Sequence, residues 1–172
     1  SFAKGHSASY AVESYQSLFL KAYHPLEFYT AVINNYGGFY RTEFYVHAAR
    51  MCGAQVEAPC VNHSLAEARL QGTSLWLGLS MVQGLEQRFI AQILHERAHQ
   101  GPFTGLSDFI ARVPCTLAQM KLLLRMGAFR FTGEDRKALM WELHCLMSGN
   151  TGSSEPQMLF SEPVKSWTLP AL

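Results

Sequence analysis

The stretch Leu79–Ile93, LSMVQGLEQRFIAQI, decides the fold of this 172-residue chain. An apolar run with helical spacing ends at Gly84, and a second apolar run resumes shortly after it at Phe89. Because no linker intervenes, the chain must turn sharply on one residue, and glycine reaches positive φ at little steric cost. The pattern therefore predicts a helix, a glycine-centred turn and a second helix, with an echo of the same plan over residues 108–126.

The start of the second helix is suited to binding an anion. Its first N–H groups have no partner inside the helix, and the positive end of the helix dipole adds to their attraction for a phosphate oxygen. Helix, hairpin and helix is the plan of the helix-hairpin-helix, which contacts nucleic-acid backbones without reading sequence. The same pattern is also typical of an ordinary corner between two helices that binds nothing.

Composition describes a folded protein with a local rather than a global charge signal. Hydrophobic residues make up 48% of the chain and charged residues 16%, while the net charge is only +1. Any nucleic-acid site must therefore be confined to one surface. The four cysteines form no C-x-x-C pair, which favours reduced thiols of a cytosolic protein and predicts neither a metal site nor a disulfide. We find no membrane-spanning apolar run and no signal peptide.

Periodicity predicts a mainly α fold with a small β-element. In the first half, aromatic side chains recur with helical spacing, which favours a packed core over a surface that stacks bases. Ser7 is the expected N-cap of the first helix. Helices are expected over residues 7–23, 26–34, 39–51, 106–112, 117–126 and 134–147, in addition to the two of the hairpin, with strands over 54–59, 66–70 and 74–78.

Several short motifs, taken in order, resemble one family. The segments FAKGHSASYA (residues 2–11) and LKAYHPLEF (residues 20–28) are similar to the fingers motif of the C-family bacterial DNA polymerases. That family comprises the α subunit of DNA polymerase III and its relatives. Further matches follow in the family's order, at RMCG (residues 50–53), APCVN (58–62), GLSMVQGL (78–85), GPF (101–103) and GAF (127–129).

The resemblance implies a fragment of a DNA-directed DNA polymerase, a nucleotidyltransferase of the bacterial cytoplasm. Residues 1–60 would be the C-terminal part of the fingers and residues 61–78 a connecting β-element. Residues 79–147 would form a tandem helix-hairpin-helix region that binds duplex DNA, followed by an irregular tail over 148–172. The chain begins with serine, directly before the first motif, which also indicates a fragment.

The same resemblance places the catalytic centre outside this chain. No D-x-D pattern that could hold the two catalytic metals occurs in it. We therefore expect no catalytic residue and no cofactor here, Mg²⁺ bound elsewhere in the parent enzyme, and no nucleotide incorporation by the chain alone. The implied partners are primer-template DNA, a deoxynucleoside triphosphate and other replication subunits, with no membrane.

A nucleotide contact is expected near the N-terminus. Lys4, His6 and Ser7 fall in a glycine-containing segment that reads as a loop before a helix, where charge and backbone N–H groups can meet a triphosphate. From the residues alone a solvated lysine and an N-capping loop are the favoured interpretation, and it is the resemblance that reverses this preference towards nucleotide binding. Ala3 and Gly5 replace the family's asparagine and serine, so one side-chain hydrogen bond is lost.

Duplex DNA contacts are expected at both hairpins. The first has Gln83-Gly84-Leu85-Glu86 where the family has K-G-V-G, and the carboxylate of Glu86 stands where a phosphate would lie, which weakens an anion site. The second carries a candidate N-cap and cations one turn apart on one helix. The predicted contact residues are Gly84, Leu85, Arg112, Thr116, Lys121 and Arg125.

Two alternatives to a DNA site stay open at this stage. The cations of the second hairpin are also typical of a solvated helix face. The whole chain also fits a non-enzymatic helical module whose degraded hairpin binds another protein. A positive stripe through Arg112, Lys121 and Arg125 would favour DNA, whereas an exposed apolar patch would favour the protein partner.

Overall fold

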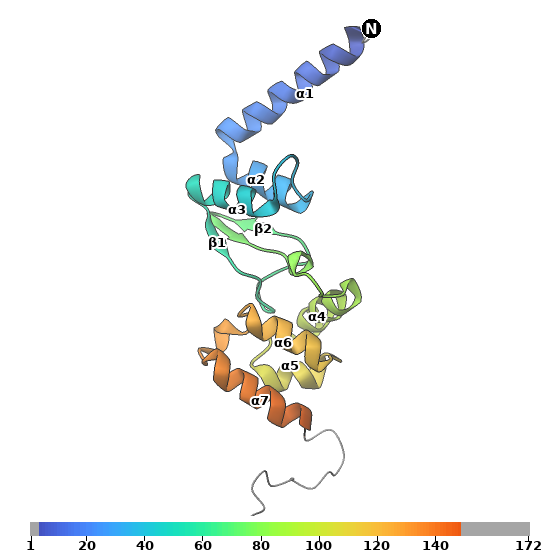
Figure 1. The fold of residues 1–172 in the computed structure, drawn as a ribbon, viewed down its shortest axis with the longest axis vertical. Coiled ribbons are helices and arrows are strands. Elements are labelled where there is room, and N and C mark those ends of the chain that lie inside the picture. The colour runs from blue at the N-terminus through green and yellow to red at the C-terminus, as the bar shows by residue number, and fades with distance from the viewer. Residues whose placement is uncertain (1–3, 149–172) are drawn as a thin grey trace, which may run out of the picture.

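The computed structural model describes residues 4–148, which form seven α-helices, two 3-10 turns and a three-stranded sheet (Figure 1). The predicted mainly α class with a small β-element is confirmed. The irregular tail was predicted over residues 148–172: Ser148 instead ends the last helix, and residues 149–172 lie outside the described part. The elements are α1 (Lys4–Tyr23), α2 (Pro25–Asn34), α3 (Thr42–Met51), β1 (Gln55–Glu57), β2 (Arg69–Gln71), β3 (Ser74–Trp76), η1 (Leu79–Met81), α4 (Gln87–Gln100), α5 (Leu106–Arg112), α6 (Leu117–Arg125), η2 (Arg130–Thr132) and α7 (Arg136–Ser148).

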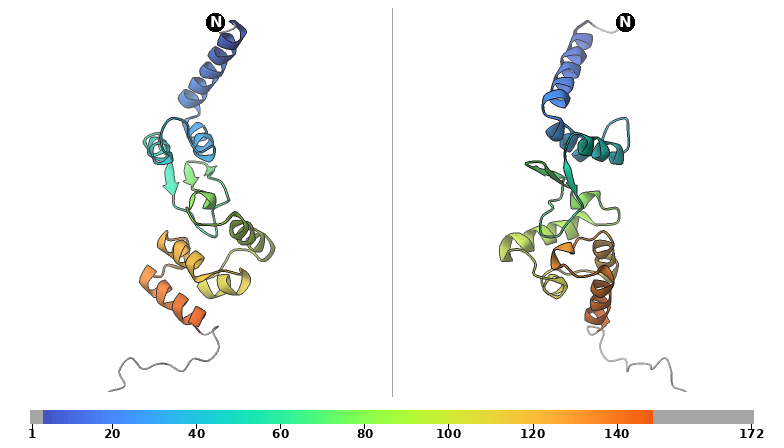
Figure 2. Two further views of the ribbon diagram at one scale, coloured as in Figure 1. Left: turned by 45° about the vertical axis from the view of Figure 1, so that its right-hand side comes forward. Right: turned by 90° about the vertical axis from the view of Figure 1, so that its left-hand side faces the viewer.

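Helix α1 projects away from the rest of the molecule in all three views, and none of its residues is buried (Figures 1 and 2). Two expectations are corrected. Lys4 begins the helix, so His6 and Ser7 lie within it and Ser7 is not an N-cap. The aromatic side chains of α1 are also exposed rather than packed, Tyr23 to 70%. Helical spacing aligned these rings on one side, but no other described element covers them.

Helices α2 and α3 pack together and onto the sheet to form a first core. The carboxamide of Asn34 ties the end of α2 to the entry of β2: its Nδ2 donates to the carbonyl oxygen of Ala68 at 2.9 Å, and its Oδ1 accepts from the Ala68 N–H at 2.7 Å. These two hydrogen bonds imitate the pair of backbone hydrogen bonds between neighbouring strands. The buried members of this core are Tyr29, Ile33, Ala49, Ala54, Ala68 and Leu75.

The sheet has the order β1-β3-β2. β2 and β3 form the predicted antiparallel hairpin around Gly72, which has a φ of +61°. β1 pairs with β3 in parallel, a pairing that the sequence did not indicate. The connection between them contains β2 and no helix, so the expected absence of a βαβ unit holds within the described residues.

The loop from β1 to β2 is fixed from inside by a buried serine. The hydroxyl of Ser64 accepts from the Cys60 N–H at 3.0 Å and donates to the carbonyl oxygen of Leu77 at 2.8 Å. The same loop crosses Gly78 so closely that a Cβ there would overlap the Ala66 carbonyl oxygen. Residues 60–66 are thereby held against the end of the sheet, directly before the hairpin region.

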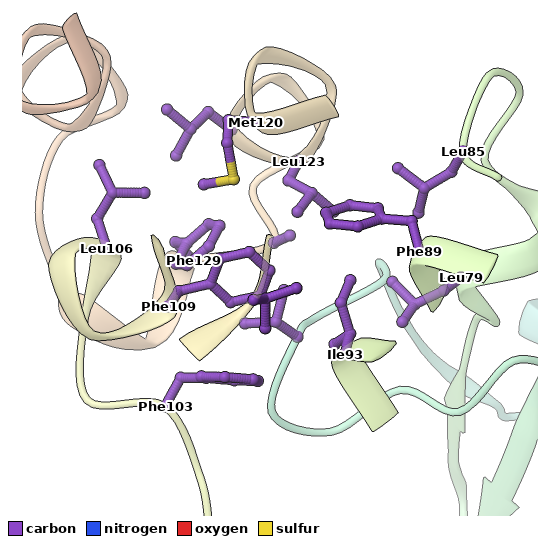
Figure 3. Close-up of a cluster of buried hydrophobic side chains, with 14 of the residues drawn as sticks. Leu79, Leu85, Phe89, Ile93, Phe103, Leu106, Phe109, Met120, Leu123 and Phe129 are labelled. Carbon is purple, nitrogen blue, oxygen red and sulfur yellow. The ribbon is translucent and has the colours of Figure 1, made fainter. Parts of the chain in front are cut away.

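The second core joins η1 and helices α4 to α7 (Figure 3). Figure 3 shows Leu85, Phe89 and Leu123 converging from the hairpin turn, α4 and α6. Most of the apolar residues predicted for the helices of the first hairpin contribute to it. Its buried members are Val61, Leu79, Leu85, Phe89, Ile90, Ile93, Phe103, Leu106, Phe109, Val113, Met120, Leu123, Leu124, Ala128, Phe129, Leu139 and Leu143.

The first helix of the first hairpin is shorter than predicted. Residues 79–81 make one 3-10 turn only, and Val82 is extended, with φ −81° and ψ 109°. The N–H groups of Leu79 and Ser80 donate to the carbonyl oxygens of Leu65 and Ala66, both at 2.9 Å. These bonds tie the start of η1 to the preceding loop, and the turn ends where the extended Val82 leads into the Gly84 turn. The domain boundaries at residues 60, 78 and 147 stay predictions.

Candidate nucleic-acid interface

Gly84 forms the turn that the sequence predicted. Its φ is +87°, and the N–H of Leu85 closes the turn by donating to the carbonyl oxygen of Val82 at 3.1 Å. The side chain of Leu85 is 8% exposed and enters the second core, so this residue anchors the turn and its N–H is already bonded. A Cβ on Gly84 would lie 3.4 Å from Cδ1 of Leu122, which places the turn directly against α6.

Helix α4 begins beside this turn with an uncapped N-terminus. The backbone of Glu86 is extended at φ −72° and ψ 141°, and its side chain makes no capping hydrogen bond. No acidic residue occupies the first turn of α4, and Arg88 there is exposed. The N–H groups at the start of α4 are therefore available to an anion, with the exposed carboxylate of Glu86 next to them as the opposing charge.

Helix α6 begins as predicted. The Thr116 hydroxyl accepts from the Gln119 N–H at 3.3 Å, and the Gln119 side chain accepts from the Thr116 N–H at 2.8 Å, so the two form a capping box. Further along, Lys121 is half-buried and Arg125 exposed, one turn apart on one face. Within residues 4–148 neither cation forms an ion pair.

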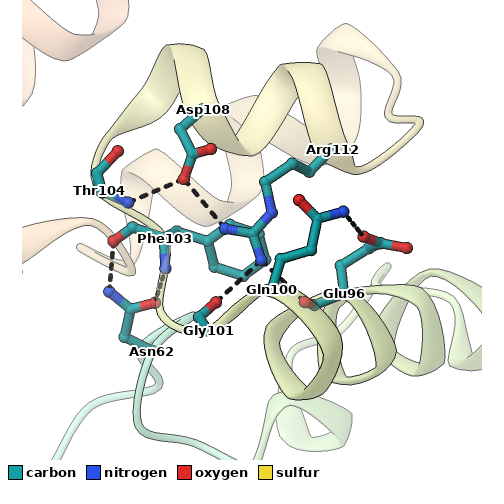
Figure 4. A network of polar contacts seen from close by, with 8 residues as sticks. All are labelled: Asn62, Glu96, Gln100, Gly101, Phe103, Thr104, Asp108 and Arg112. Atoms are coloured by element: carbon teal, nitrogen blue, oxygen red, sulfur yellow. Dashed lines mark hydrogen bonds and ion pairs between the residues drawn. The ribbon is translucent and has the colours of Figure 1, made fainter.

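Arg112 has a different place from the one predicted (Figure 4). Its Nη2 donates to the carbonyl oxygens of Glu96 at 2.8 Å and Gly101 at 2.9 Å, and its Nη1 pairs with Asp108 Oδ2 at 3.2 Å. The guanidinium also lies 4.3 Å from the centre of the Phe103 ring. All these partners belong to the protein, so Arg112 joins α5 to the end of α4 and is not available to a phosphate.

Asp108 and Asn62 extend this network across the connection between α4 and α5 (Figure 4). The Thr104 N–H donates to Asp108 Oδ2 at 3.0 Å, and this bond, with Arg112, holds the pKa of the carboxyl below its usual value. Asn62 bonds both backbone groups of Phe103, donating to its carbonyl oxygen and accepting from its N–H, each at 2.8 Å. The network fixes the position of α5 and the second hairpin relative to the first hairpin.

Two further arginines position the region, and sequence reasoning gave them no such role. Arg97 on α4 donates to the carbonyl oxygens of Val61 and Ser64, both at 2.8 Å. Arg130 donates to those of Ala58 at 2.8 Å and Pro59 at 3.1 Å, and it pairs with Glu57 at 3.2 Å. Neither pairing could be read from sequence, because 33 to 73 residues separate the partners. Together they attach the segment between sheet and hairpins to α4 and η2.

The predicted nucleotide residues are not brought to this interface. Lys4, His6 and Ser7 lie at the far end of the projecting helix α1 (Figure 1). The ring of His6 packs edge-on against that of Tyr10, with centres 4.5 Å apart. Lys4 and Ser7 are three residues apart and therefore share a helix face. Any nucleotide contact there would be separate from the duplex contact.

The described part of the chain, residues 4–148, contains no group of three or more histidine, cysteine or acidic side chains arranged to hold a metal ion. None of its helices is both long and apolar enough to cross a membrane. Its four cysteines are free thiols, with Cys52 and Cys145 exposed and Cys60 buried.

The comparison with known families agrees with this geometry. Residues 53–139 match the family described as helix-hairpin-helix motif, which is half of the chain. The chain belongs to the helix-hairpin-helix family. The matched range contains the Gly84 turn, α4, α5 and α6, together with the sheet and the loop that Arg97 and Arg130 attach to them.

The same chain is homologous to the C-family DNA polymerases, as its motifs indicated. It is 34% identical over 151 residues to the error-prone DNA polymerase of Mycobacterium bovis, an alignment that covers 86% of this chain and 14% of that polymerase. It is 33% identical over 150 residues to the DNA polymerase III subunit alpha of Thermus aquaticus, covering 85% and 12%. The chain thus spans about a seventh of the length of these relatives.

Proposed function

We propose that this chain is the fingers and duplex-binding segment of a bacterial C-family DNA polymerase. Its helix-hairpin-helix region holds primer-template duplex by the phosphate backbone and reads no base sequence. One observation carries the proposal: the Gly84 turn packs against Leu122, so the uncapped start of α4 and the cations of α6 lie on neighbouring elements. A single DNA backbone could meet both.

The interface provides a small number of phosphate contacts. One is the start of α4, and the others are Lys121 and Arg125, while Leu85 and Thr116 hold the two hairpins in shape. Two or three contacts imply a slope of log K against log salt of about −2 to −3 and an affinity in the non-specific range, roughly 10⁻⁴ to 10⁻⁶ M. Backbone N–H groups and phosphate-directed cations do not distinguish bases.

In the parent enzyme the exposed N-terminal turns of α1 would meet the incoming deoxynucleoside triphosphate. Lys4 and Ser7 share one face of this helix and His6 lies beside them, so a cation and a hydroxyl would reach the phosphates together. Mg²⁺ bound by other parts of the polymerase would neutralise phosphate charge during nucleotidyl transfer. Other replication subunits and a location in the bacterial cytoplasm belong to the same proposal.

A second candidate function has one observation in its favour. The described surface carries many exposed aromatic side chains on α1 and in the connection between α2 and α3. Apolar surface of this kind also marks protein interaction sites. In this alternative the chain is a helical interaction module, and Glu86 marks a hairpin that no longer binds DNA.

Duplex titrations followed by fluorescence anisotropy at several salt concentrations separate the two. Lys121→Glu with Arg125→Glu should abolish binding of a blunt duplex, because it reverses both cations of α6. Lys21→Glu with Arg69→Glu is the matched control: both residues are exposed cations outside the hairpins, and the change in net charge is the same. This control should keep most of the affinity.

A third variant tests the first hairpin. Glu86→Gly should strengthen binding by removing the carboxylate beside the start of α4, and Glu86→Gln should do so through charge alone. Equal affinities for wild type, the double α6 variant and Glu86→Gly would reject the DNA interface in favour of the interaction module.

A further inference from the structure

The connection between α2 and α3, together with the first turn of α3, presents four aromatic side chains to solvent. Tyr36 is 74% exposed, Phe39 93%, Tyr40 54% and Phe44 51%, and we refer to these four residues as the aromatic loop. Their sequence spacing had indicated a packed core, and the structure corrects this. Neighbouring rings are in contact: the centres of Phe39 and Tyr40 lie 5.3 Å apart, and those of Tyr40 and Phe44 4.5 Å.

The aromatic loop is held in shape by a half-buried neighbour. The hydroxyl of Tyr45 accepts from the N–H groups of Gly38 and Tyr40, both at 3.2 Å. The backbone of Gly37 has a φ of +76° and is so close to the Tyr45 ring that a Cβ there would lie 2.7 Å from it. The exposed rings therefore sit on a preorganised support, which lowers the entropy that binding a ligand must overcome.

Tyr36 ends α2 in a left-handed cap. Its φ is +60°, the one positive value of a non-glycine residue in the described chain. The N–H groups of Tyr36 and Gly37 donate to the carbonyl oxygens of Ile33 at 3.1 Å and Val32 at 2.7 Å, which is the pattern of a Schellman motif. This helix end places an aromatic side chain at the edge of a groove.

The groove runs from the aromatic loop to the first hairpin. It has a volume of about 530 Å³, and its lining includes Tyr36 of the aromatic loop, His47 and Arg50 of α3, and Ser80 and Met81 of η1. Met81 precedes Gly84 by three residues, so the groove ends within about 11 Å of the hairpin turn. A strand leaving a duplex at that turn needs to extend only a short way to enter it.

The charges around the groove favour a nucleic acid over an apolar protein segment. Arg50 lines it, and the exposed Arg41 directly precedes α3 beside the loop, whereas Glu43 is the one acidic residue of the lining. Successive aromatic faces with cations between them are the arrangement that binds single strands, because every base has a face that stacks.

We infer that the aromatic loop is a stacking platform for the single-stranded DNA that continues from the bound duplex. Bases stack on Phe39 and Tyr40, and Tyr36 closes the groove, while Arg41 and Arg50 meet the phosphates. That the single strand continues from a bound duplex rests on the proposed duplex contact. The platform itself binds a single strand without the duplex.

The test compares a blunt duplex with the same duplex carrying a five-nucleotide single-stranded extension that contains 2-aminopurine. In the wild-type chain the extension should tighten binding about 10-fold, with quenching of the 2-aminopurine fluorescence by the stacked rings. Phe39→Ala should remove most of this gain and the quenching, without changing blunt-duplex affinity. Arg50→Ala should reduce the salt slope for the extended duplex by about one.

Tyr23→Ala is the control, because Tyr23 is an exposed aromatic residue on α1, outside the groove. It should behave as wild type. An extension that adds no affinity, or a gain that survives Phe39→Ala, overturns the inference while leaving the duplex proposal intact.

Titration with a labelled single strand alone distinguishes failure of the stacking platform from failure of the duplex proposal. Quenching that Phe39→Ala abolishes supports the platform even if blunt duplex does not bind, in which case the duplex proposal fails by itself. A dimer in sedimentation velocity that dissociates on Phe39→Ala would instead assign the aromatic loop to a second copy of the chain and overturn the inference.

Discussion

Arg112→Ala tests whether this residue serves the fold or the DNA. The guanidinium donates to the carbonyl oxygens of Glu96 and Gly101, pairs with Asp108 and covers the ring of Phe103. Its side chain is 10% exposed, so truncation leaves partners that water reaches poorly. Alanine would remove the bonds to these three polar partners and leave a cavity between α4 and α5.

The size of the effect follows from these contacts. Breaking a buried ion pair by removing one partner destabilises a protein by about 3–5 kcal/mol. The carboxylate of Asp108 keeps 29% exposure and can be hydrated, which favours the lower end, about 3 kcal/mol. For a chain of this size each kcal/mol lowers Tm by about 2–4 °C, so Tm should fall by about 6–12 °C.

Urea and thermal unfolding followed by far-UV circular dichroism measure the loss. Arg112→Lys should recover only part of it, because an ammonium group cannot reach two carbonyl oxygens and a carboxylate with the geometry of the guanidinium. Arg125→Ala removes an exposed arginine and should change stability by less than about 0.5 kcal/mol. If Arg112→Ala is as stable as Arg125→Ala, or reduces the salt slope of duplex binding by about one, Arg112 is a phosphate contact and our assignment is wrong.

Two further predictions concern Gly78 and Asp108. Gly78→Ala should destabilise the chain by about 2 kcal/mol or more, because its Cβ would lie 2.5 Å from the Glu67 carbonyl carbon and 2.8 Å from the Ala68 nitrogen. Gly105→Ala, whose Cβ meets nothing within 4 Å, is the control, and equal urea midpoints for both would contradict the close approach. The pKa of Asp108 is lowered in the folded state, so its contribution to stability is present above about pH 4 and is lost as the pH falls further. Asp108→Asn should flatten the acid limb of the unfolding free energy below about pH 4, and an unchanged limb in urea titrations would exclude this carboxyl as its source.

The amino-acid sequence by itself determined the local features. Gly84 can form its turn because glycine has no side chain that opposes a positive φ. The capping box of Thr116 and Gln119 joins residues three apart. The helices over residues 25–34, 106–112 and 117–125 follow from apolar spacing and nearby stop signals. Each of these depends on contacts within one turn of helix, where propensity and spacing act directly.

Only the tertiary structure decided what covers each face and which cations are free. Arg112 and Arg125 look alike in sequence, but carbonyl oxygens 11 and 16 residues away bind Arg112, and none among the described residues binds Arg125. The aromatic stripes of α1 and of the aromatic loop were visible as patterns, but whether another element covers them depends on the rest of the fold. Likewise the bonds that tie the first N–H groups of η1 to Leu65 and Ala66 join segments 14 residues apart. Contacts between segments distant in sequence settle these points, and periodicity within a segment carries no information about its partner.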